Sequence, residues 1–230
     1  MHQSKRYKQA VKLVDEKKTY SVEQAVDILK SMPHAKFDET LEVSSKLGAD
    51  PKEADQLVRG SVVLPAGTGK AIKILVFCES EKEKEAKDAG ADYIGSDEII
   101  DKILKQGWSD FDCCIATPAQ MRVVSKLGKV LGPRGLMPSP KTGTVTENVS
   151  HAIKEAKRGK IDFRMDKFGC VHVGIGKISF SRESLIANIN AFIDAMQAAK
   201  PQSIKGDYIK GFYLSTTMSP SVKIALGKYD

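Results

Sequence analysis

The sequence predicts a mixed α/β protein (α+β) with two domains: a discontinuous α+β domain built from both termini, and an inserted Rossmann-like three-layer α/β domain. Three observations predict this organisation. The first part of the chain follows an α-α-β-β pattern, the middle alternates short apolar strands with helices, and the last part returns to long strands around one helix. We therefore expect residues 1–67 and 160–230 to form the terminal domain and residues 68–159 the inserted domain.

The first part of the chain carries clear helix and strand signals. Apolar residues at helical spacing predict a first helix, and these are Tyr7, Ala10, Val11 and Val14. Ser21 followed three residues later by Gln24 is a capping-box pattern, which predicts a second helix that ends near Pro33. Residues 41–47 alternate apolar and polar side chains, as a half-buried strand does, and residues 58–64 continue the pattern.

The middle of the chain predicts a mostly parallel sheet. The expected strands are 72–77, 92–94 and 111–116, and the expected helices between them are 81–88 and 96–105. Strands separated by helices form parallel sheets that are covered on both faces. After the third strand, Thr117 as N-cap and Pro118 as first helical residue predict another helix.

The last part of the chain predicts a β-α-β arrangement that follows a helix near 148–158. Strands are expected at 171–178 and 208–217. The helix between them has a stripe of apolar residues at a 3.6-residue period, namely Leu185, Ile189, Phe192, Ile193 and Met196. Pro201 closes that helix. The segments 67–69 and 158–160 are the expected hinges between the two domains.

The composition favours a basic, unexported protein. Lys and Arg number 36 against 29 Asp and Glu in 230 residues, and the net charge of +7 favours polyanionic partners. No run of 18 apolar residues or signal-peptide core is present, so we expect a cytoplasmic protein with no membrane partner. The four cysteines form no C-x-x-C pair and have no spaced histidine partners, which predicts reduced, apolar-like cysteines and no metal.

The residues predict no enzyme and no cofactor. The Gly67-Thr68-Gly69-Lys70 segment lacks the earlier glycine and the following Ser or Thr of a phosphate loop, and it precedes a strand instead of following one. An α/β enzyme or nucleotide-binding protein would need a glycine turn after the 72–77 strand, and residues 78–82 contain no glycine. The histidines and carboxylates form no catalytic arrangement. A general RNA-binding regulator remains an alternative.

A glycine- and proline-rich stretch at 128–141 predicts a loop without regular structure. No acidic residue occurs from 113 to 146, whereas this region contains the basic residues Arg122, Lys126, Lys129, Arg134 and Lys141. Two interpretations stay open at this point: a proline-stiffened loop with incidental charge, or a secondary basic loop that contacts phosphates.

The same stretch, GKVLGPRGLMPSPK, resembles the signature of the ribosomal large-subunit protein one family of bacteria. Three other segments resemble the family in order: ETLEVSSKLGADPKEADQLVRGSVVLPAGTGK, FRMDKFGCVHVGIGKISF and LSTTMSPSVKI. The resemblance implies a two-domain protein, monomeric when free, that binds large-subunit (23S) rRNA beside other ribosomal components. It also implies a mobile stalk that helps deacylated tRNA leave the exit site, and repression of translation through binding of its own mRNA.

The resemblance further implies an RNA surface on the terminal domain. Its residues here are Lys36, Phe37, Thr40, Glu42, Lys46, Asp166, Lys167, His172, Ser215, Thr216, Thr217, Met218, Ser219 and Pro220. Hydroxyl groups can bond ribose hydroxyls, lysines neutralise phosphates, and exposed apolar side chains contact nucleotide faces. The family usually has glycine where Ser219 stands, so a backbone with positive φ at this position would be strained by the side chain.

Overall fold

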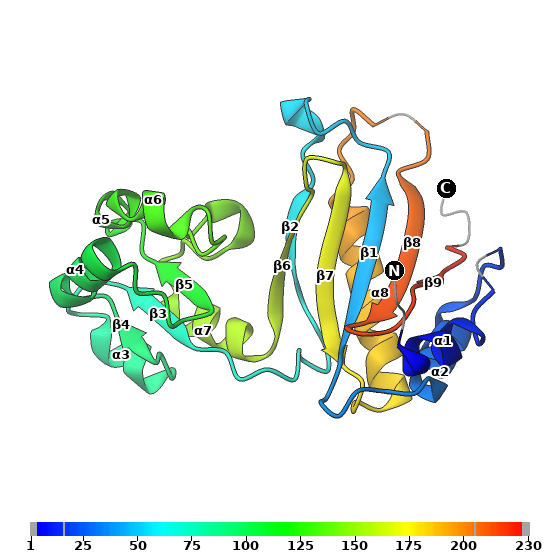
Figure 1. The fold of residues 1–230 in the computed structure, drawn as a ribbon. Helices are drawn as coiled ribbons and strands as arrows, with labels where there is room; N and C mark the ends of the chain where they lie inside the picture. Colours follow the sequence, from blue (N-terminus) through cyan, green and yellow to red (C-terminus); the bar gives the residue numbers. More distant parts are fainter. Residues whose placement is uncertain (1–3, 16, 205, 227–230) are drawn as a thin grey trace. The chain divides into compact units, whose positions relative to one another are not determined.

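The computed structural model describes residues 4–15, 17–204 and 206–226 (Figure 1). The chain divides into two compact units: residues 1–69 with 161–230, called here the terminal unit, and residues 70–160, called the inserted unit. Helices and strands occur in both units, which confirms the mixed α/β class. The independence of the two units as domains and the Rossmann-like character of the insert remain predictions.

The terminal unit is built on a four-stranded antiparallel sheet of order β7-β1-β8-β9 (Figure 1). The strands are β1 (Thr40–Leu47), β7 (Cys170–Lys177), β8 (Ile209–Thr216) and β9 (Val222–Lys223). In β1 the predicted alternation is confirmed, because Leu41, Val43 and Leu47 are buried while Glu42 and Lys46 are exposed. The sheet therefore has one face in the core and one face toward solvent.

Helices cover the core face of this sheet. They are α2 (Val22–Ser31) and α8 (Arg182–Ala198), while α1 (Lys5–Val11) adds Ala10 to the same hydrophobic cluster. The Ser21 capping box is confirmed: its hydroxyl accepts from the Gln24 amide and the Gln24 side chain accepts from the Ser21 amide. The five apolar residues that predicted α8 are all buried in one cluster with the sheet. A short ladder of β2 (Arg59–Val63) and β6 (Lys160–Arg164) and a 3₁₀ turn, Ala54–Gln56, complete the unit.

The inserted unit contains a three-stranded parallel sheet of order β4-β3-β5. Its strands are β3 (Ile74–Phe77), β4 (Tyr93–Ile94) and β5 (Cys113–Ala116), and its helices are α3 (Glu83–Asp88), α4 (Asp97–Gln106), α5 (Met121–Lys126), α6 (Gly128–Leu131) and α7 (Val149–Lys157). Side chains of β3 alternate between two hydrophobic clusters, with Ile74 and Val76 in one and Leu75 and Phe77 in the other. The predicted covering of both sheet faces is thus present.

Two local predictions in this unit are wrong. Thr117 does not cap a helix: residues 118–120 form a turn, closed by the Gln120 amide donating to the Thr117 carbonyl at 3.1 Å, and α5 begins only at Met121. The stretch at 128–141 is not loop throughout, because Gly128–Leu131 is one helical turn. Burial of Leu131 against the sheet outweighs the low helix propensity of the glycine that starts this turn.

Two of the four cysteines, Cys78 and Cys114, behave as predicted from their apolar surroundings. Cys78 and Cys114 are buried, Cys113 and Cys170 are partly buried, and none forms a disulfide. Burial raises the pKa of the Cys78 and Cys114 thiols above the ordinary value, which keeps them protonated and unreactive at neutral pH. No helix among the described residues is both long and apolar enough to cross a membrane.

Candidate nucleic-acid interface

The solvent-facing side of the four-stranded sheet, called here the open face, displays polar side chains in cross-strand rows. In the central row His172 of β7, Ser44 of β1, Tyr213 of β8 and Lys223 of β9 lie opposite one another. In the next row Glu42 lies between Gly174 and Ser215. Glycine in this row leaves the face flat, so an extended ligand can approach the backbone closely.

Lysines dominate the charge of this face. Around the open face lie Lys46, Lys167, Lys177 and Lys223, against the carboxylates Glu42 and Asp166. Lys177 donates to the Thr40 hydroxyl at 2.8 Å, which fixes its ammonium group at the edge of the face. A face with more cations than anions attracts a polyanion through its phosphates.

One end of the open face, the loop end, is formed by residues 35–38 and 217–220. It exposes two large apolar side chains, since Phe37 is 52% and Met218 49% accessible. The segments are joined by reciprocal hydrogen bonds: the Thr40 amide donates to the Thr217 hydroxyl at 3.0 Å, and the Thr217 amide donates to the Thr40 carbonyl at 3.1 Å. Exposed apolar side chains on an ordered loop are suited to stacking on a nucleotide face.

A buried carboxylate, Glu39, holds the loop end together. Only 1% accessible, it accepts from the Ala35 amide at 2.6 Å, the Met218 amide at 3.3 Å and the Thr216 hydroxyl. The Arg6 guanidinium of α1 donates to it at 3.1 Å. Burial acts to raise the pKa of Glu39, but the hydrogen bonds from Thr216 and the two amides outweigh it, so the pKa lies below the ordinary value.

Ser219 fits its turn without backbone strain. No described residue other than glycine has positive φ, so the side chain at this position meets no left-handed penalty. Its hydroxyl accepts from the Thr216 amide at 2.8 Å and donates to the Pro220 carbonyl at 2.9 Å. Serine therefore stabilises the turn that presents Met218, and the strain considered for this position is not present.

Removing this hydroxyl should loosen the turn. We expect Ser219→Ala to lower the free energy of unfolding by about 1 kcal/mol, the usual loss for one such hydrogen bond. Urea denaturation monitored by circular dichroism measures the effect, and Ser221→Ala, at an exposed position two residues on, is the control. Equal stability of the Ser219 variant and the wild type would contradict the role given to the hydroxyl.

The opposite end of the open face, the hairpin end, is the turn at 166–169 between β6 and β7. One oxygen of Asp166 accepts from the Phe168 amide at 2.8 Å and the Cys170 amide at 2.7 Å. Burial acts to raise the pKa of Asp166, but the two backbone hydrogen bonds outweigh this effect. The pKa therefore lies below the ordinary value, and the carboxylate is ionised at neutral pH. Lys46 donates to the Phe168 carbonyl, and the Phe168 side chain is 66% accessible beside Lys167.

The structure brings the residues implied by the resemblance onto this one surface, with one exception. Residues of the open face and its two ends are Lys36, Phe37, Thr40, Glu42, Lys46, Asp166, Lys167, His172, Ser215, Thr217, Met218, Ser219 and Pro220. Thr216 is the exception, because it is buried and its hydroxyl donates to Glu39. Sequence reasoning missed Glu39 and Phe168, and also Tyr213 in the central row.

The secondary basic loop belongs to the inserted unit. Arg122 and Lys126 lie one turn apart on α5, Lys129 lies on α6, and Arg134 lies in the turn that follows. These four side chains are exposed, and no ion pair found among the described residues includes any of them. The Lys141 side chain lies outside the part of the chain that the structure describes. Each of the four described cations is therefore exposed to solvent without an ion-pair partner in the described part of the chain.

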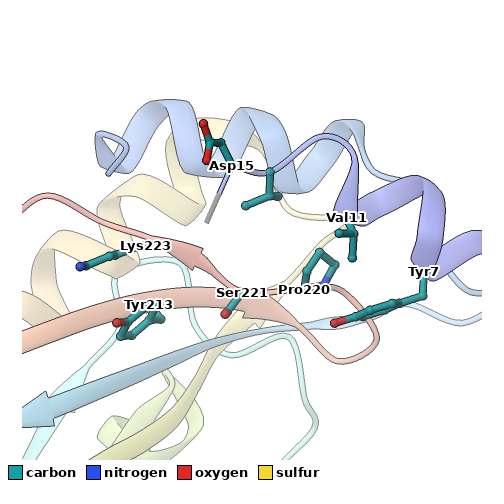
Figure 2. A pocket seen from close by; sticks show the side chains of 8 residues that line it. Tyr7, Val11, Asp15, Tyr213, Pro220, Ser221 and Lys223 are labelled. Atoms are coloured by element: carbon teal, nitrogen blue, oxygen red, sulfur yellow. The ribbon is translucent and has the colours of Figure 1, made fainter. Parts of the chain in front are cut away.

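A pocket of about 280 Å³ adjoins the loop end (Figure 2). Figure 2 shows Tyr7 and Val11 extending from α1 toward Pro220 and Ser221, with Tyr213 farther along β8. Val14, Asp15 and Lys223 complete its lining. Tyr213 and Lys223 belong both to the pocket and to the central row, so the open face continues into this pocket.

A mixed α/β fold with a cationic, polar sheet face suits a protein that binds a polyanion. Residues 29–220 match the family described as the Ribosomal protein L1p/L10e family, and the chain belongs to it. The family is a structural component of the ribosome and not an enzyme. The resemblance found in the sequence motifs is thereby confirmed.

Two relatives carry the name large ribosomal subunit protein uL1. The chain is 54% identical over 227 residues to that of Protochlamydia amoebophila (strain UWE25), covering 99% of this chain and 96% of the relative. It is 55% identical over 223 residues to that of Persephonella marina (strain DSM 14350 / EX-H1), covering 96% and 92%. The chain is accordingly a structural protein of the large ribosomal subunit.

Proposed function

We propose that the open face binds a folded segment of large-subunit (23S) rRNA. The observation that carries this proposal is the gathering of three sequence-distant segments, 36–46, 166–172 and 215–220, on one uncovered sheet face. Exposed apolar side chains mark both ends of the face, and lysines lie between and around them. The hydroxyls of Thr40, Ser44 and Ser215 are suited to bonding ribose hydroxyls, which distinguish RNA from DNA.

Lysines and apolar side chains contribute to RNA binding in different ways. Lys46, Lys167 and Lys177 supply salt-dependent affinity by neutralising phosphates, without reading sequence. The apolar side chains of Phe37, Met218 and Phe168 require unstacked or exposed bases, and so favour a structured RNA over a regular duplex. Thr216 and Glu39 act indirectly, because their hydrogen bonds fix the turn that presents Met218.

Titration of the full-length chain with RNA tests this proposal. A stem-loop from large-subunit RNA should bind more tightly than a scrambled sequence of equal length, and its affinity should fall between 50 and 200 mM salt by about tenfold or more. Equal affinity for both RNAs would overturn the specific part of the proposal. Affinity independent of salt would overturn the role of the lysines.

Truncation of the loop end should weaken this complex. We expect Met218→Ala or Thr217→Ala to lower the free energy of RNA binding by at least about 1 kcal/mol, because each removes an interface contact. Leu104→Ala, which removes an exposed apolar side chain from α4 of the inserted unit, is the matched control and should leave affinity unchanged. Unchanged affinity in both loop-end variants would place the RNA surface elsewhere.

We propose further that the chain forms part of a mobile stalk that assists release of deacylated tRNA from the exit site. The exposed cations Arg122, Lys126, Lys129 and Arg134 support a second RNA contact in the inserted unit, of the phosphate-neutralising kind. We also propose that the open face binds the chain's own mRNA and represses its translation, because rRNA and mRNA sites of the same structure would present the same groups. Competition between the two RNAs for the chain tests this second role.

A further inference from the structure

The hairpin end brings together three side chains that the sequence did not suggest as a set. Among the described residues, Asp166, Cys170 and His172 place a carboxylate oxygen, a thiol sulfur and an imidazole nitrogen within 4.8 Å of one another. Asp166 lies in the turn before β7, and Cys170 and His172 lie on the same side of that strand because they are two residues apart. The open face thus carries one group of three metal-ligating atoms.

Three hydrogen bonds orient two of these ligands in advance. One Asp166 oxygen is held by the Phe168 and Cys170 amides, which leaves Oδ2 directed to His172 Nε2 at 4.0 Å. The other ring nitrogen of His172, Nδ1, lies 3.0 Å from the Ser44 hydroxyl. When Nδ1 carries the proton and donates to Ser44, Nε2 presents its lone pair to the group. Such outer hydrogen bonds fix the ligands of metal sites in the same way.

We propose that Asp166, Cys170 and His172 bind a Zn²⁺ ion with a fourth coordination position open. Zinc takes thiolate, imidazole and carboxylate ligands at about 2.0 to 2.3 Å in a tetrahedral arrangement, which separates the ligand atoms by about 3.3 to 3.6 Å. The three atoms lie within 4.8 Å of one another, so they need to close by roughly an ångström to reach this spacing. On binding, the Cys170 thiol loses its proton to solvent and the thiolate sulfur bonds the metal.

The open position has a definite consequence for the surface. The site lies on the face proposed to bind RNA, so the fourth ligand is water in the free protein and a phosphate oxygen can replace it. The thiolate and carboxylate neutralise the charge of the ion, which makes binding possible beside Lys46 and Lys167. The zinc site does not depend on the proposed RNA function, because its ligands and their orientation belong to the chain alone.

Co²⁺ titration of the reduced, full-length protein without RNA tests the site. Tetrahedral cobalt bound by a thiolate gives visible ligand-field bands and a sulfur-to-cobalt charge-transfer band in the near ultraviolet, and Zn²⁺ should displace both. Cys170→Ala should abolish the charge-transfer band and weaken Zn²⁺ binding at least tenfold. Cys113→Ala, which changes the other partly buried cysteine, should leave both unchanged.

The Zn²⁺ affinity of Ser44→Ala is a second measurement. It would stay unchanged if the metal only contacted the thiol nonspecifically. Loss of the hydrogen bond to His172 Nδ1 should weaken Zn²⁺ affinity about tenfold while the cobalt spectrum keeps its thiolate band. A wild-type spectrum without a thiolate band would overturn the proposal, as would a band that survives Cys170→Ala. Since no RNA is present, failure of this test leaves the RNA titration unaffected.

Discussion

Replacement of Glu39 by alanine is expected to lower the free energy of unfolding by about 3 kcal/mol, because a buried carboxylate then leaves its partners unpaired. The Thr216 hydroxyl and the Met218 amide lose their acceptor in the interior, and Arg6 loses its ion pair. Urea denaturation at neutral pH measures the loss. Glu53→Ala, which removes an exposed carboxylate without a capping hydrogen bond, is the control and should change stability by less than about 0.5 kcal/mol.

The same variant should weaken RNA binding although Glu39 does not reach the surface. Its hydrogen bonds fix both segments of the loop end, so their loss frees Phe37 and Met218 to move and adds an entropic cost to binding. Measured at a temperature where the variant is fully folded, affinity for the stem-loop should fall about tenfold. Wild-type affinity in the folded variant would show that the loop end is ordered without this carboxylate, or that it contributes nothing to binding.

Acidification should affect Glu39 in a defined direction. Its pKa is lowered in the folded state, so its stabilisation is complete above the unfolded value of 4.5 and is lost as the pH falls through the lowered folded value. Other carboxylates, such as Asp166, titrate in the same range. The informative quantity is therefore the difference in unfolding free energy between wild type and Glu39→Gln, which should shrink between pH 6 and pH 3. A difference independent of pH would contradict the assignment.

Local signals in the sequence were sufficient for most of the fold. The capping box at Ser21, the alternation in β1 and the apolar stripe of α8 each act over a few residues and predict their elements correctly. The two wrong predictions arise where local sequence preferences compete with tertiary packing. Thr117 is buried at the end of β5, where its amide donates to the Phe77 carbonyl, and a turn follows it before α5 begins. In Gly128–Leu131, packing overrides propensity.

The candidate site depended on a resemblance, since its geometry is nonlocal. Ser44 and His172 are 128 residues apart in sequence, and only the register of β1 with β7 makes them neighbours. Glu39 was overlooked because a carboxylate before a strand ordinarily faces solvent, and its burial depends on groups contributed from distant segments. Phe168 was overlooked because an aromatic residue between strands ordinarily belongs to the core. In both cases the position in three dimensions, and not the residue type, indicates the role.

The second large loss of stability is expected when Asn188, a buried polar residue, is replaced. It lies in the apolar stripe of α8, and its side chain is fully inaccessible. Its amide nitrogen donates to the Ile175 carbonyl at 2.7 Å and the Gly67 carbonyl at 3.0 Å, and its oxygen accepts from the Ala66 amide at 2.9 Å. The Asn188 side chain of α8 therefore links Ala66 and Gly67 to β7 through hydrogen bonds.

Asn188→Ala should lower the free energy of unfolding by about 3 kcal/mol, because three backbone groups lose their partner and a cavity remains. Asn190→Ala, an exposed asparagine on the same helix, is the matched control and should leave stability within about 0.5 kcal/mol of the wild type. Urea denaturation of both variants provides the comparison. Asn188→Leu, which fills the volume but cannot bond the three groups, should be nearly as destabilised as the alanine variant. Recovery of wild-type stability by leucine would mean that volume, and not hydrogen bonding, is what this position requires.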